Sequence, residues 1–300
     1  MTVLAVDVGG TKLAAAVWAG ALGEVTRSPT GTDPWTALTE LLDPLVAGVA
    51  GIGVGCGGPM AWPAGAVSPL NIPAWRGGFP LRDRLAERYG VPVRLHNDAA
   101  CAAVGEHWQG GWGTDHLLGM VVSTGVGGGL VIGGRLVDGA GGNAGHVGHI
   151  VVDPLGPPCP CGGRGCLEAI ARGPAIVAWA AGQGCTAGTG VELAELAAHG
   201  DRVALQAFAQ AGRALGVGIA SAAALLDVEV VAVGGGISQV PALWPTLRRT
   251  LREHARLSFL GELRVEPAAL GPTAGLVGAA ALLVAGDRYW SPSRAGAVEG

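Results

Sequence analysis

Charged side chains are scarce in this sequence. They make up 14% of the 300 residues, and the formal net charge is −4. So small a net charge produces no strong global field that would attract nucleic acid or an anionic membrane surface. Apolar residues reach 49%, and this composition argues against disorder because disordered chains combine low hydrophobicity with high net charge. We therefore expect a globular protein with ample core and with neither nucleic acid nor a membrane as its partner.

Targeting segments and disulfides are also lacking. The apolar N-terminus meets Asp7 without a basic region before it, which predicts a strand and not a signal peptide. The uncharged stretch 267–286 is long enough for a membrane span, but Gly271-Pro272 interrupts it early and a buried helix is the better prediction. Three of the cysteines are better explained as metal ligands than as disulfides, which agrees with a reducing compartment. We expect a cytoplasmic protein.

Two common nucleotide-binding motifs are absent. The chain has no G-x-x-x-x-G-K-[ST] loop, and the glycines that follow the apolar run 229–233 lack the G-x-G-x-x-G spacing. Glycine itself is abundant, at 54 residues, and it clusters in short loops. This distribution indicates many places where the backbone turns sharply or approaches a ligand closely.

The segment 143–168 carries the densest group of metal-binding residue types. Cys159, Cys161 and Cys166 fall within eight residues, and His149 lies ten residues before the first of them. One imidazole and three thiolates make a closed Cys₃His set, which is a structural type of zinc site. The glycines between these cysteines allow the backbone to fold back tightly. Three unrelated buried cysteines are the alternative, and clustering this tight disfavours it.

A strand, a glycine turn and a second strand occur twice in the chain. The apolar runs 3–8 and 13–18 flank Gly9-Gly10-Thr11-Lys12, which predicts a hairpin whose turn offers backbone N–H groups to an anion. Asp7 at the end of the first strand could hold Mg²⁺, although a glycine hairpin is also common without any function. The plan recurs over 117–132 around Thr124-Gly125. The repetition suggests a duplicated fold with nucleotide phosphates between the two turns.

Asn97 and Asp98 follow the predicted strand 91–95 and open a predicted helix over 99–108. The end of a strand is where α/β folds bind ligands, but either side chain could instead cap the helix. Asn71 lies in the proline-rich stretch 68–75, where the residues alone favour a turn. Three glycines, Gly234 to Gly236, follow the strand 229–233 and suit close packing against an adenosine group.

Together these motifs resemble those of the ROK family (repressors, open reading frames and sugar kinases). The most specific is the run 159–168 behind G-H-x-G-H at 145–149, and D-V-G-G-T-K at 7–12 and N-D-A-A at 97–100 add to it. The resemblance implies an α/β, actin-like ATPase (ribonuclease H-like) duplicated fold with two domains around a cleft, usually a homodimer or homotetramer. The first domain would cover 1–113 and the second 114–273, with a C-terminal helix, about 274–290, packing back toward the first.

The resemblance also implies ATP-dependent phosphorylation of a sugar 6-hydroxyl, with Mg²⁺ and a structural Zn²⁺. Asp98 would be the base that accepts the hydroxyl proton. The zinc would brace His149 and Glu168 without activating water. The implied sugar contacts are Asn71, Asn97, Asp98, His146, His149 and Glu168. The implied ATP and phosphate contacts are Asp7, Gly9, Gly10, Thr11, Lys12, Thr124, Gly125, Gly234, Gly235 and Gly236, and the implied zinc ligands are His149, Cys159, Cys161 and Cys166.

One position departs from the pattern of the family's glucokinases. Many of them carry Glu where this chain has His146, and a carboxylate only accepts hydrogen bonds whereas a neutral imidazole also donates one. The family's N-acetylmannosamine kinases have a comparable G-H-x-G-H. We therefore expect N-acetylmannosamine as substrate, with glucose as the alternative. His146 could also be a neutral replacement, because specificity rests on several contacts.

Two other functions compete with a sugar kinase. Repressors of the family carry a helix-turn-helix domain before the first phosphate motif, which begins here at residue 7. A sugar-binding protein that has lost catalysis is the other alternative. The presence of Asp98, Thr11 and Thr124 argues against it.

Overall fold

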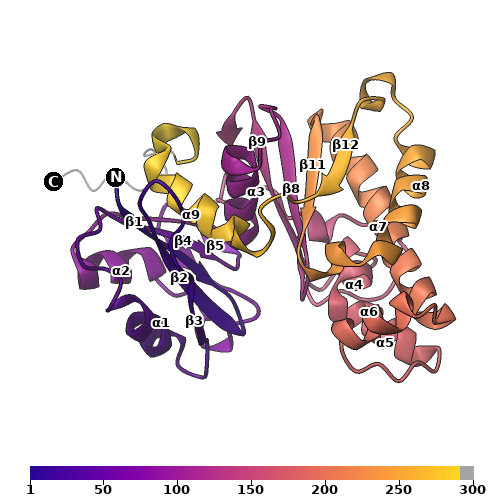
Figure 1. The fold of residues 1–300 in the computed structure, drawn as a ribbon, viewed down its shortest axis with the longest axis horizontal. Helices are drawn as coiled ribbons and strands as arrows, with labels where there is room; N and C mark the ends of the chain where they lie inside the picture. The colour runs from indigo at the N-terminus through magenta and orange to yellow at the C-terminus, as the bar shows by residue number, and fades with distance from the viewer. Residues whose placement is uncertain (291–300) are drawn as a thin grey trace. The chain divides into compact units, whose positions relative to one another are not determined.

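The structure is a computed structural model that describes residues 1–290, apart from the side chain of residue 287. The chain forms two compact units (Figure 1). The first unit contains Met1–Asp115, Gly129–Gly145 and the chain from Ala269 onward. The second unit contains His116–Gly128 and His146–Ala268. The chain therefore passes from one unit to the other four times.

A five-stranded mixed sheet forms the centre of the first unit. Its strand order is β3-β2-β1-β4-β7. Strand β2 is antiparallel to both of its neighbours, whereas β1, β4 and β7 run parallel. Because parallel strands end at the same edge of a sheet, the segments that follow these three strands come together there. The strands are β1 (Val3–Val8), β2 (Lys12–Trp18), β3 (Thr26–Pro29), β4 (Ile52–Cys56) and β7 (Val93–Asn97).

Helices cover both faces of this sheet, which explains why most residues of its parallel strands are buried. Alternate residues of β1 enter different cores: Leu4 and Val6 pack in one cluster with α1 and α2, and Val3 and Ala5 pack in the other with α3 and α9. The helices are α1 (Pro34–Leu42), α2 (Leu81–Tyr89), α3 (Asp98–Gln109) and α9 (Ala274–Val284). The expected buried helix in the uncharged stretch 267–286 is confirmed as α9.

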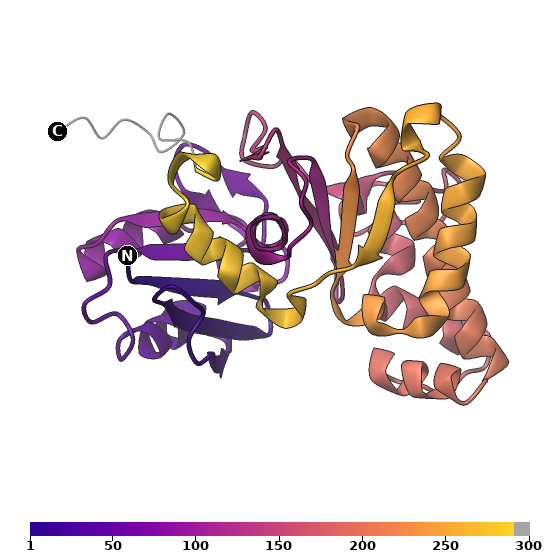
Figure 2. The same cartoon turned by 45° about the horizontal axis from the view of Figure 1, so that its top comes forward.

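Glycines allow α9 to approach its neighbours at backbone distance. A Cβ on Gly278 would overlap the carbonyl oxygen of Cys101 in α3, and one on Gly53 of β4 would overlap that of Ala279. Gly105 of α3 is packed in the same way against Ala274. Figures 1 and 2 show α9, in yellow, beside α3. Close-packed interiors leave no room for an added methyl group at such positions.

The second sheet has the order β10-β9-β8-β11-β12. Strands β8, β11 and β12 run parallel, and β10 is antiparallel to β9. When the strands of each sheet are counted along the chain, both sheets have the spatial order third, second, first, fourth, fifth. The strand order is therefore repeated, and the fold is α/β with mixed sheets. The boundary between the two units falls within β9. The strands are β8 (Leu117–Val122), β9 (Val126–Ile132), β10 (Arg135–Leu136), β11 (Val230–Gly234) and β12 (Arg264–Pro267).

The helices of the second unit include one 25-residue helix, α7. The amphipathic stretch 203–226 predicts one long helix that could break near Gly216 or Gly218, and the break is absent: α7 runs unbroken because its glycines make room for α8 and the turn before it. A Cβ on Gly216 would lie 2.8 Å from the Cβ of Thr250, and Gly212 is packed against the backbone at Leu243. The helices are α4 (Leu167–Ala171), α5 (Gly173–Gly182), α6 (Gly190–Ala198), α7 (Arg202–Leu226) and α8 (Trp244–His254).

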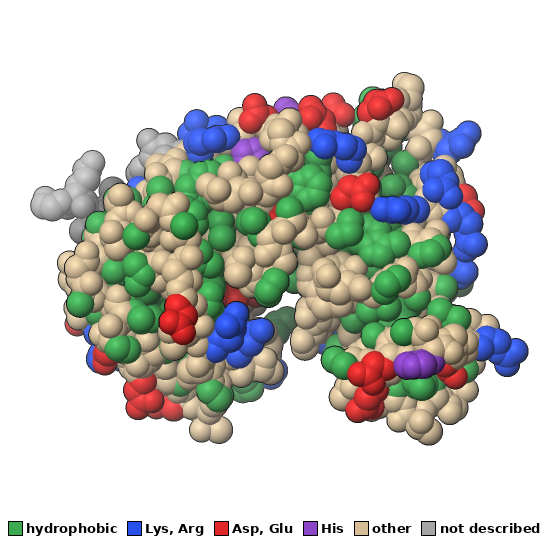
Figure 3. All heavy atoms as spheres, in the orientation of Figure 1, with side chains coloured by type: hydrophobic (Ala, Val, Ile, Leu, Met, Phe, Trp, Pro, Cys, Tyr) green, Lys and Arg blue, Asp and Glu red, His purple; other side chains and the backbone are tan. Residues whose placement is uncertain are grey.

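Among residues 1–290, α7 alone is long and apolar enough to cross a membrane. Length and composition are weak evidence when one helix passes, because the core helix of a soluble protein passes the same test. More than half of its apolar window is buried inside the protein. On the face shown in Figure 3 charged side chains are scattered among hydrophobic and neutral atoms.

The remaining elements are short. A small hairpin, β5 (Met60–Ala61) and β6 (Ala66–Val67), belongs to the first unit. The 3₁₀ turns are η1 (Pro73–Trp75), η2 (Val147–His149), η3 (Gly236–Gln239), η4 (Pro241–Leu243), η5 (Ser258–Leu260), η6 (Gly271–Thr273) and η7 (Gly286–Arg288).

Candidate functional site

The ends of β1, β4 and β7 gather the predicted site residues of the first unit. Asp7 pairs in register with Gly55, and Cys56 pairs with Asn97. The turn after β1 is closed by a hydrogen bond of 3.1 Å from Gly9 N to the carbonyl of Lys12. A Cβ on Gly10 would lie 2.7 Å from Cγ of Asn71. The exposed Asn71 side chain therefore lies on the glycine turn, which requires glycine at that position.

Asp98 is the first residue of α3, directly after Asn97. Asn97 Oδ1 caps the helix, since it accepts hydrogen bonds from Ala99 N at 3.0 Å and Ala100 N at 3.2 Å. The capping alternative for Asn97 is confirmed, and its contact with a sugar stays a prediction. Asp98 Oδ1 accepts a hydrogen bond of 2.8 Å from Ala99 N. The carboxylate is partly exposed.

Gly57 lies close to the side chains of both Asn71 and Asp98. A Cβ built there would be 3.4 Å from Asn71 Oδ1 and 4.0 Å from Asp98 Oδ2. The amide of Asn71 and the carboxylate of Asp98 thus lie on either side of a residue without a side chain, beside the turn at Gly10. The structure brings Asn71 and Asp98 together, although they are far apart in the sequence.

Negative charge accumulates at the same edge of the sheet. Burial raises the pKa of Asp7 to about 7, the negative charge of Asp98 adds to the rise, and Lys12 opposes it. A Cβ on Gly275, in the first turn of α9, would lie 3.9 Å from Cγ of Asp7. Carboxylate oxygens are ligands that Mg²⁺ accepts. A divalent cation here would relieve the repulsion that raises the pKa of Asp7.

The raised pKa of Asp7 predicts how stability depends on pH in the absence of Mg²⁺ and ATP. The folded state binds the proton more tightly than the unfolded chain, whose carboxyl has a pKa of 3.8. The stabilisation is therefore complete below about pH 4 and is lost as pH rises through the folded pKa of about 7. At about 1.4 kcal/mol per pKa unit the loss is at most about 4 kcal/mol, and water near the half-buried carboxyl reduces it.

The Asp7→Asn variant tests this expectation because Asn does not titrate. Urea unfolding of both proteins at pH 5 and pH 8 should show a smaller loss of unfolding free energy for Asp7→Asn than for the parent. Equal losses in the two proteins would show that Asp7 does not carry the effect.

The four predicted zinc ligands of the second unit converge. His149 Nδ1 and the sulfur atoms of Cys159, Cys161 and Cys166 all lie within 4.8 Å of one another. The distance from Cys161 Sγ to Cys166 Sγ is 3.8 Å, and that from Cys159 Sγ to His149 Nδ1 is also 3.8 Å. A tetrahedral zinc ion with Zn–S bonds of about 2.3 Å places its sulfur ligands about 3.8 Å apart. The donor set and its spacing fit this ion.

Protons compete with a metal ion for two of the three cysteines, whereas the pKa of Cys161 is lowered by a hydrogen bond from the backbone of Gly163. Burial raises the pKa of Cys166 to about 12 and raises that of Cys159 as well. Without a cation these thiols hold their protons at neutral pH. A metal ion that binds thiolates must therefore displace protons from the site.

Glu168 connects the cysteine segment to the second glycine turn. Its Oε2 accepts a hydrogen bond of 2.9 Å from Val126 N, and a Cβ on Gly125 would lie 2.9 Å from the same oxygen. A Cβ on Gly148 would overlap the carbonyl oxygen of Val126. The segment of η2 and the helix α4 that begins at Leu167 therefore both pack against the turn 123–126.

His146 precedes η2, and its ring stacks against that of His149 with centroids 6.2 Å apart. Gly235 has a φ of 89° and is packed against the backbone of Val122, so both its conformation and its space require glycine. By contrast, within the described part of the chain no heavy atom outside its chain neighbours lies within 4 Å of a Cβ on Gly236. Gly236 is thus open to a ligand, and its contact with adenosine stays a prediction.

The predicted residues divide between the units. The first unit holds Asp7, Gly9, Gly10, Thr11, Lys12, Asn71, Asn97 and Asp98. The second unit holds Thr124, Gly125, His146, His149, Cys159, Cys161, Cys166, Glu168, Gly234, Gly235 and Gly236.

Sequence reasoning missed a buried polar group beside Asp98. His96 is fully buried, and its Nε2 lies 3.0 Å from Oδ1 of Asp138, which is 6% exposed. The available signal was a histidine at the end of an apolar strand and an isolated acid at the start of a glycine-rich loop. Neither signal predicts that His96 and Asp138 are hydrogen-bonded to each other.

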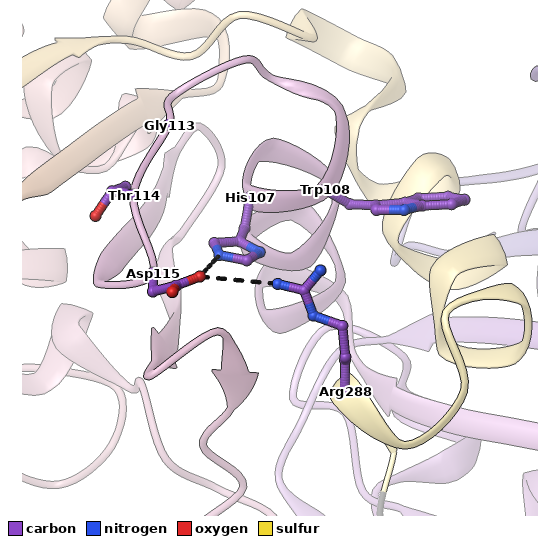
Figure 4. A pocket seen from close by; sticks show the side chains of 6 residues that line it. All are labelled: His107, Trp108, Gly113, Thr114, Asp115 and Arg288. Carbon is purple, nitrogen blue, oxygen red and sulfur yellow. Dashed lines mark ion pairs between the residues drawn. The ribbon is translucent and has the colours of Figure 1, made fainter.

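A separate hollow of about 290 Å³ contains none of the predicted residues. Asp115 Oδ1 lies 3.9 Å from both His107 Nε2 and Arg288 Nη2 there (Figure 4). These distances exceed hydrogen-bond length, and Asp115 is 68% exposed. The hollow is lined by His107, Trp108, Gly113, Thr114, Asp115 and Arg288.

Comparison with known proteins places the chain among sugar kinases. A model of the ROK family matches residues 3–285. An N-acetylmannosamine kinase of Shigella flexneri is 39% identical over 254 residues, which cover 79% of this chain and 84% of that protein. A glucokinase of Thermotoga maritima is 36% identical over 250 residues, which cover 77% of this chain and 78% of that protein.

A solved structure agrees with these relatives. A ROK family glucokinase from Streptomyces griseus, in complex with glucose and AMPPNP, matches with a TM-score of 0.83 and 33% identity. The match covers 94% of this chain and 99% of that one. The likeness therefore extends over the whole fold and is not confined to one motif.

Proposed function

The chain belongs to the ROK family, and from that premise we propose that it is a sugar kinase that transfers the γ-phosphoryl group of ATP to the 6-hydroxyl of a hexose or an N-acylated hexosamine. One observation carries the proposal: the partly exposed carboxylate of Asp98 lies with Asn71 at Gly57, beside the glycine turn that follows Asp7. Phosphoryl transfer requires positioning, charge neutralisation and a group that accepts the proton of the attacking hydroxyl.

The residues of the site can meet these requirements. Asp98 accepts the proton of the sugar hydroxyl through Oδ2, while Oδ1 stays hydrogen-bonded to the start of α3. Backbone N–H groups of the turns at Gly10 and Gly125 bind phosphate oxygens, and Gly236 leaves room for adenosine. Asp7 would hold Mg²⁺, and the ion would supply neutralisation of phosphate charge.

We assign His149, Cys159, Cys161 and Cys166 as the ligands of a structural zinc ion. Four protein ligands leave no open position, so the ion does not activate water. Its role is to hold the loop around η2 and the start of α4, and hence Glu168, against the turn 123–126. Glu168 and His146 would then meet the sugar from a braced loop.

We also infer that the two sheets are the halves of an actin-like, ribonuclease H-like duplication. The support is the repeated strand plan and the glycine turn after the first strand of each sheet. In the domain division that we propose, residues 1–113 and the C-terminal helix carry the first phosphate turn and Asp98, and residues 114–273 carry the second turn, the zinc loop and Gly234–Gly236. The compact units depart from this division because Gly129–Gly145 belongs to the first unit. Family membership further supports a cytoplasmic homodimer or homotetramer.

N-acetylmannosamine is the substrate that we favour. Many glucokinases of the family carry Glu at the position of His146. A carboxylate only accepts hydrogen bonds, whereas the imidazole of His146 can also donate one. The relative from Shigella flexneri supports this choice. Glucose is the alternative, supported by the glucokinases of Thermotoga maritima and Streptomyces griseus.

The test is ATP-dependent phosphorylation of N-acetylmannosamine, N-acetylglucosamine, glucose, mannose and fructose, with kcat/KM for each. We expect the highest value for N-acetylmannosamine. In His146→Glu the ratio of kcat/KM values should move toward glucose by about tenfold, which corresponds to about 1.4 kcal/mol.

The outcomes separate the alternatives. A parent protein that prefers glucose is a glucokinase in which His146 is a tolerated replacement. A folded protein that turns over none of the sugars contradicts the kinase proposal and favours a sugar-binding protein.

A further inference from the structure

His96 is a polar residue at a fully buried position. It lies on β7 immediately before Asn97 and Asp98, with 0% of its side chain exposed. The ring of Trp62 packs edge-on against it, with centroids 5.2 Å apart. A polar ring at this place must be fully hydrogen-bonded, because an unpaired buried polar group costs about 1–3 kcal/mol.

The hydrogen bonds of His96 define which of its two ring nitrogens carries the proton. Nδ1 accepts a hydrogen bond of 2.8 Å from Asn97 N, so Nδ1 carries no proton. The proton of the neutral imidazole is therefore on Nε2, which donates to Asp138 Oδ1 at 3.0 Å. Because one nitrogen is held by the backbone at the end of β7 and the other by Asp138, the ring links these two segments rigidly.

Asp138 begins a loop, residues 138–145, that we call the Asp138 loop. The loop closes on itself through a hydrogen bond of 3.0 Å from Ala144 N to the carbonyl of Asp138. Asn143 pairs with the backbone of Met60 in both directions, accepting from N at 2.8 Å and donating to O at 3.0 Å. The loop is thereby held in the first unit, and the chain enters the second unit directly after it, at His146.

A contribution to folding stability does not by itself explain why His96 and Asp138 are paired in the interior. Burying a carboxylate costs several kcal/mol, and apolar residues of similar size often replace a buried charged pair without loss of stability. The pair joins two segments that both lead to predicted site residues: β7 leads to Asp98, and the Asp138 loop leads to His146.

We propose that the His96–Asp138 hydrogen bond is a positioning device for sugar binding. It fixes the end of β7, and with it Asp98, relative to the Asp138 loop from which the chain continues to His146. His96 and Asp138 touch neither the sugar nor ATP and act through Asp98 and the loop. The inference rests on the proposed kinase function.

The test compares variants that keep or remove the donor at residue 96. His96→Leu cannot donate to Asp138, whereas the amide of His96→Gln can. Partners that orient the groups contacting a reaction centre typically affect function about 10–100-fold when lost. We expect His96→Leu to lower kcat/KM for the sugar by about that factor, with the KM for ATP unchanged, and His96→Gln to recover most of the loss.

A double variant separates positioning from stability. His96→Leu removes the Nε2 donor from the buried Asp138 carboxylate, so the unfolding free energy falls. In His96→Leu/Asp138→Ala the carboxylate that lost this donor is gone and stability should recover, while kcat/KM for the sugar stays low. Recovery of both quantities together would show that the pair serves only the fold and would overturn the proposal.

Amide hydrogen exchange provides a measurement that does not depend on turnover. Exchange at residues 138–145, above all at Ala144, should accelerate relative to the parent in His96→Leu and match the parent in the control His107→Gln. His107 is another buried histidine of the first unit, hydrogen-bonded to Tyr289 at 2.6 Å and remote from the Asp138 loop in sequence.

Unchanged exchange in His96→Leu would also overturn the proposal. A parent protein without turnover on any sugar would contradict the kinase function instead, and the exchange measurement would still decide whether the pair orders the loop.

Discussion

Replacing Asp98 by Asn is expected to lower kcat by about 10²–10⁴-fold, the usual contribution of a general base. Asn keeps an oxygen that can accept the 2.8 Å hydrogen bond from Ala99 N. The start of α3 should therefore remain intact, and the loss should fall on proton transfer and not on folding. Steady-state kinetics with saturating sugar and ATP measure the effect, and the melting temperature should stay close to that of the parent.

A matched control for Asp98→Asn is Asp83→Asn. Asp83 is an exposed acid of the same unit, whose carboxylate pairs with Arg82 at 2.8 Å. Its replacement should leave kcat unchanged. If Asp98→Asn retains full turnover, another group accepts the proton and the assignment of the base is wrong.

The second large effect is expected from Cys161→Ser. Loss of one thiolate from the Cys₃His cluster should release the zinc ion, because serine is a much weaker ligand for zinc. The loop 143–168 would lose its brace, and Glu168 its hold on the turn at Val126. Even about 2 kcal/mol of lost stability lowers the melting temperature by about 4–8 °C in a protein of this size. We expect a larger shift, together with a reduced kcat/KM for the sugar.

Zinc content measured by mass spectrometry decides the point directly. Cys185→Ser is the matched control, since Cys185 is a free cysteine of the second unit outside the cluster. It should retain the metal content of the parent. Equal zinc content in Cys161→Ser and the parent would contradict the ligand assignment.

Sequence patterns predicted the features whose residues lie close together in the chain. The predicted zinc ligands are close in sequence, so their spacing alone indicated the cluster of one imidazole and three thiols that the structure shows. The apolar runs that contain Asp7 and precede Asn97 indicated strands for the same reason. The apolar stretch after Gly271 gave α9, because a buried helix needs no polar face.

The sequence could not predict contacts between residues that are far apart in the chain. His96 meets Asp138 across 42 positions in the chain, and only the assembled sheet and loop bring them together. Asn71 looked like a turn residue, and its place on the turn at Gly10 depends on the order of β1 and β4. The break that α7 could have had near Gly216 is absent because tertiary packing overrode local propensity: Gly216 receives α8 and does not interrupt the helix.

The glycine packing of α9 sets an order of events during protein synthesis. The sheet of the first unit and α3 are synthesised well before α9, the helix that covers one of their faces. About 160 residues separate Asp115 from Ala274, so at about 5–20 residues per second the interval lasts roughly 8–32 s. Throughout that interval the backbone at Gly53 and Gly105 lies uncovered. The nascent chain therefore exposes the apolar face that α9 later covers, until α9 emerges and completes the core.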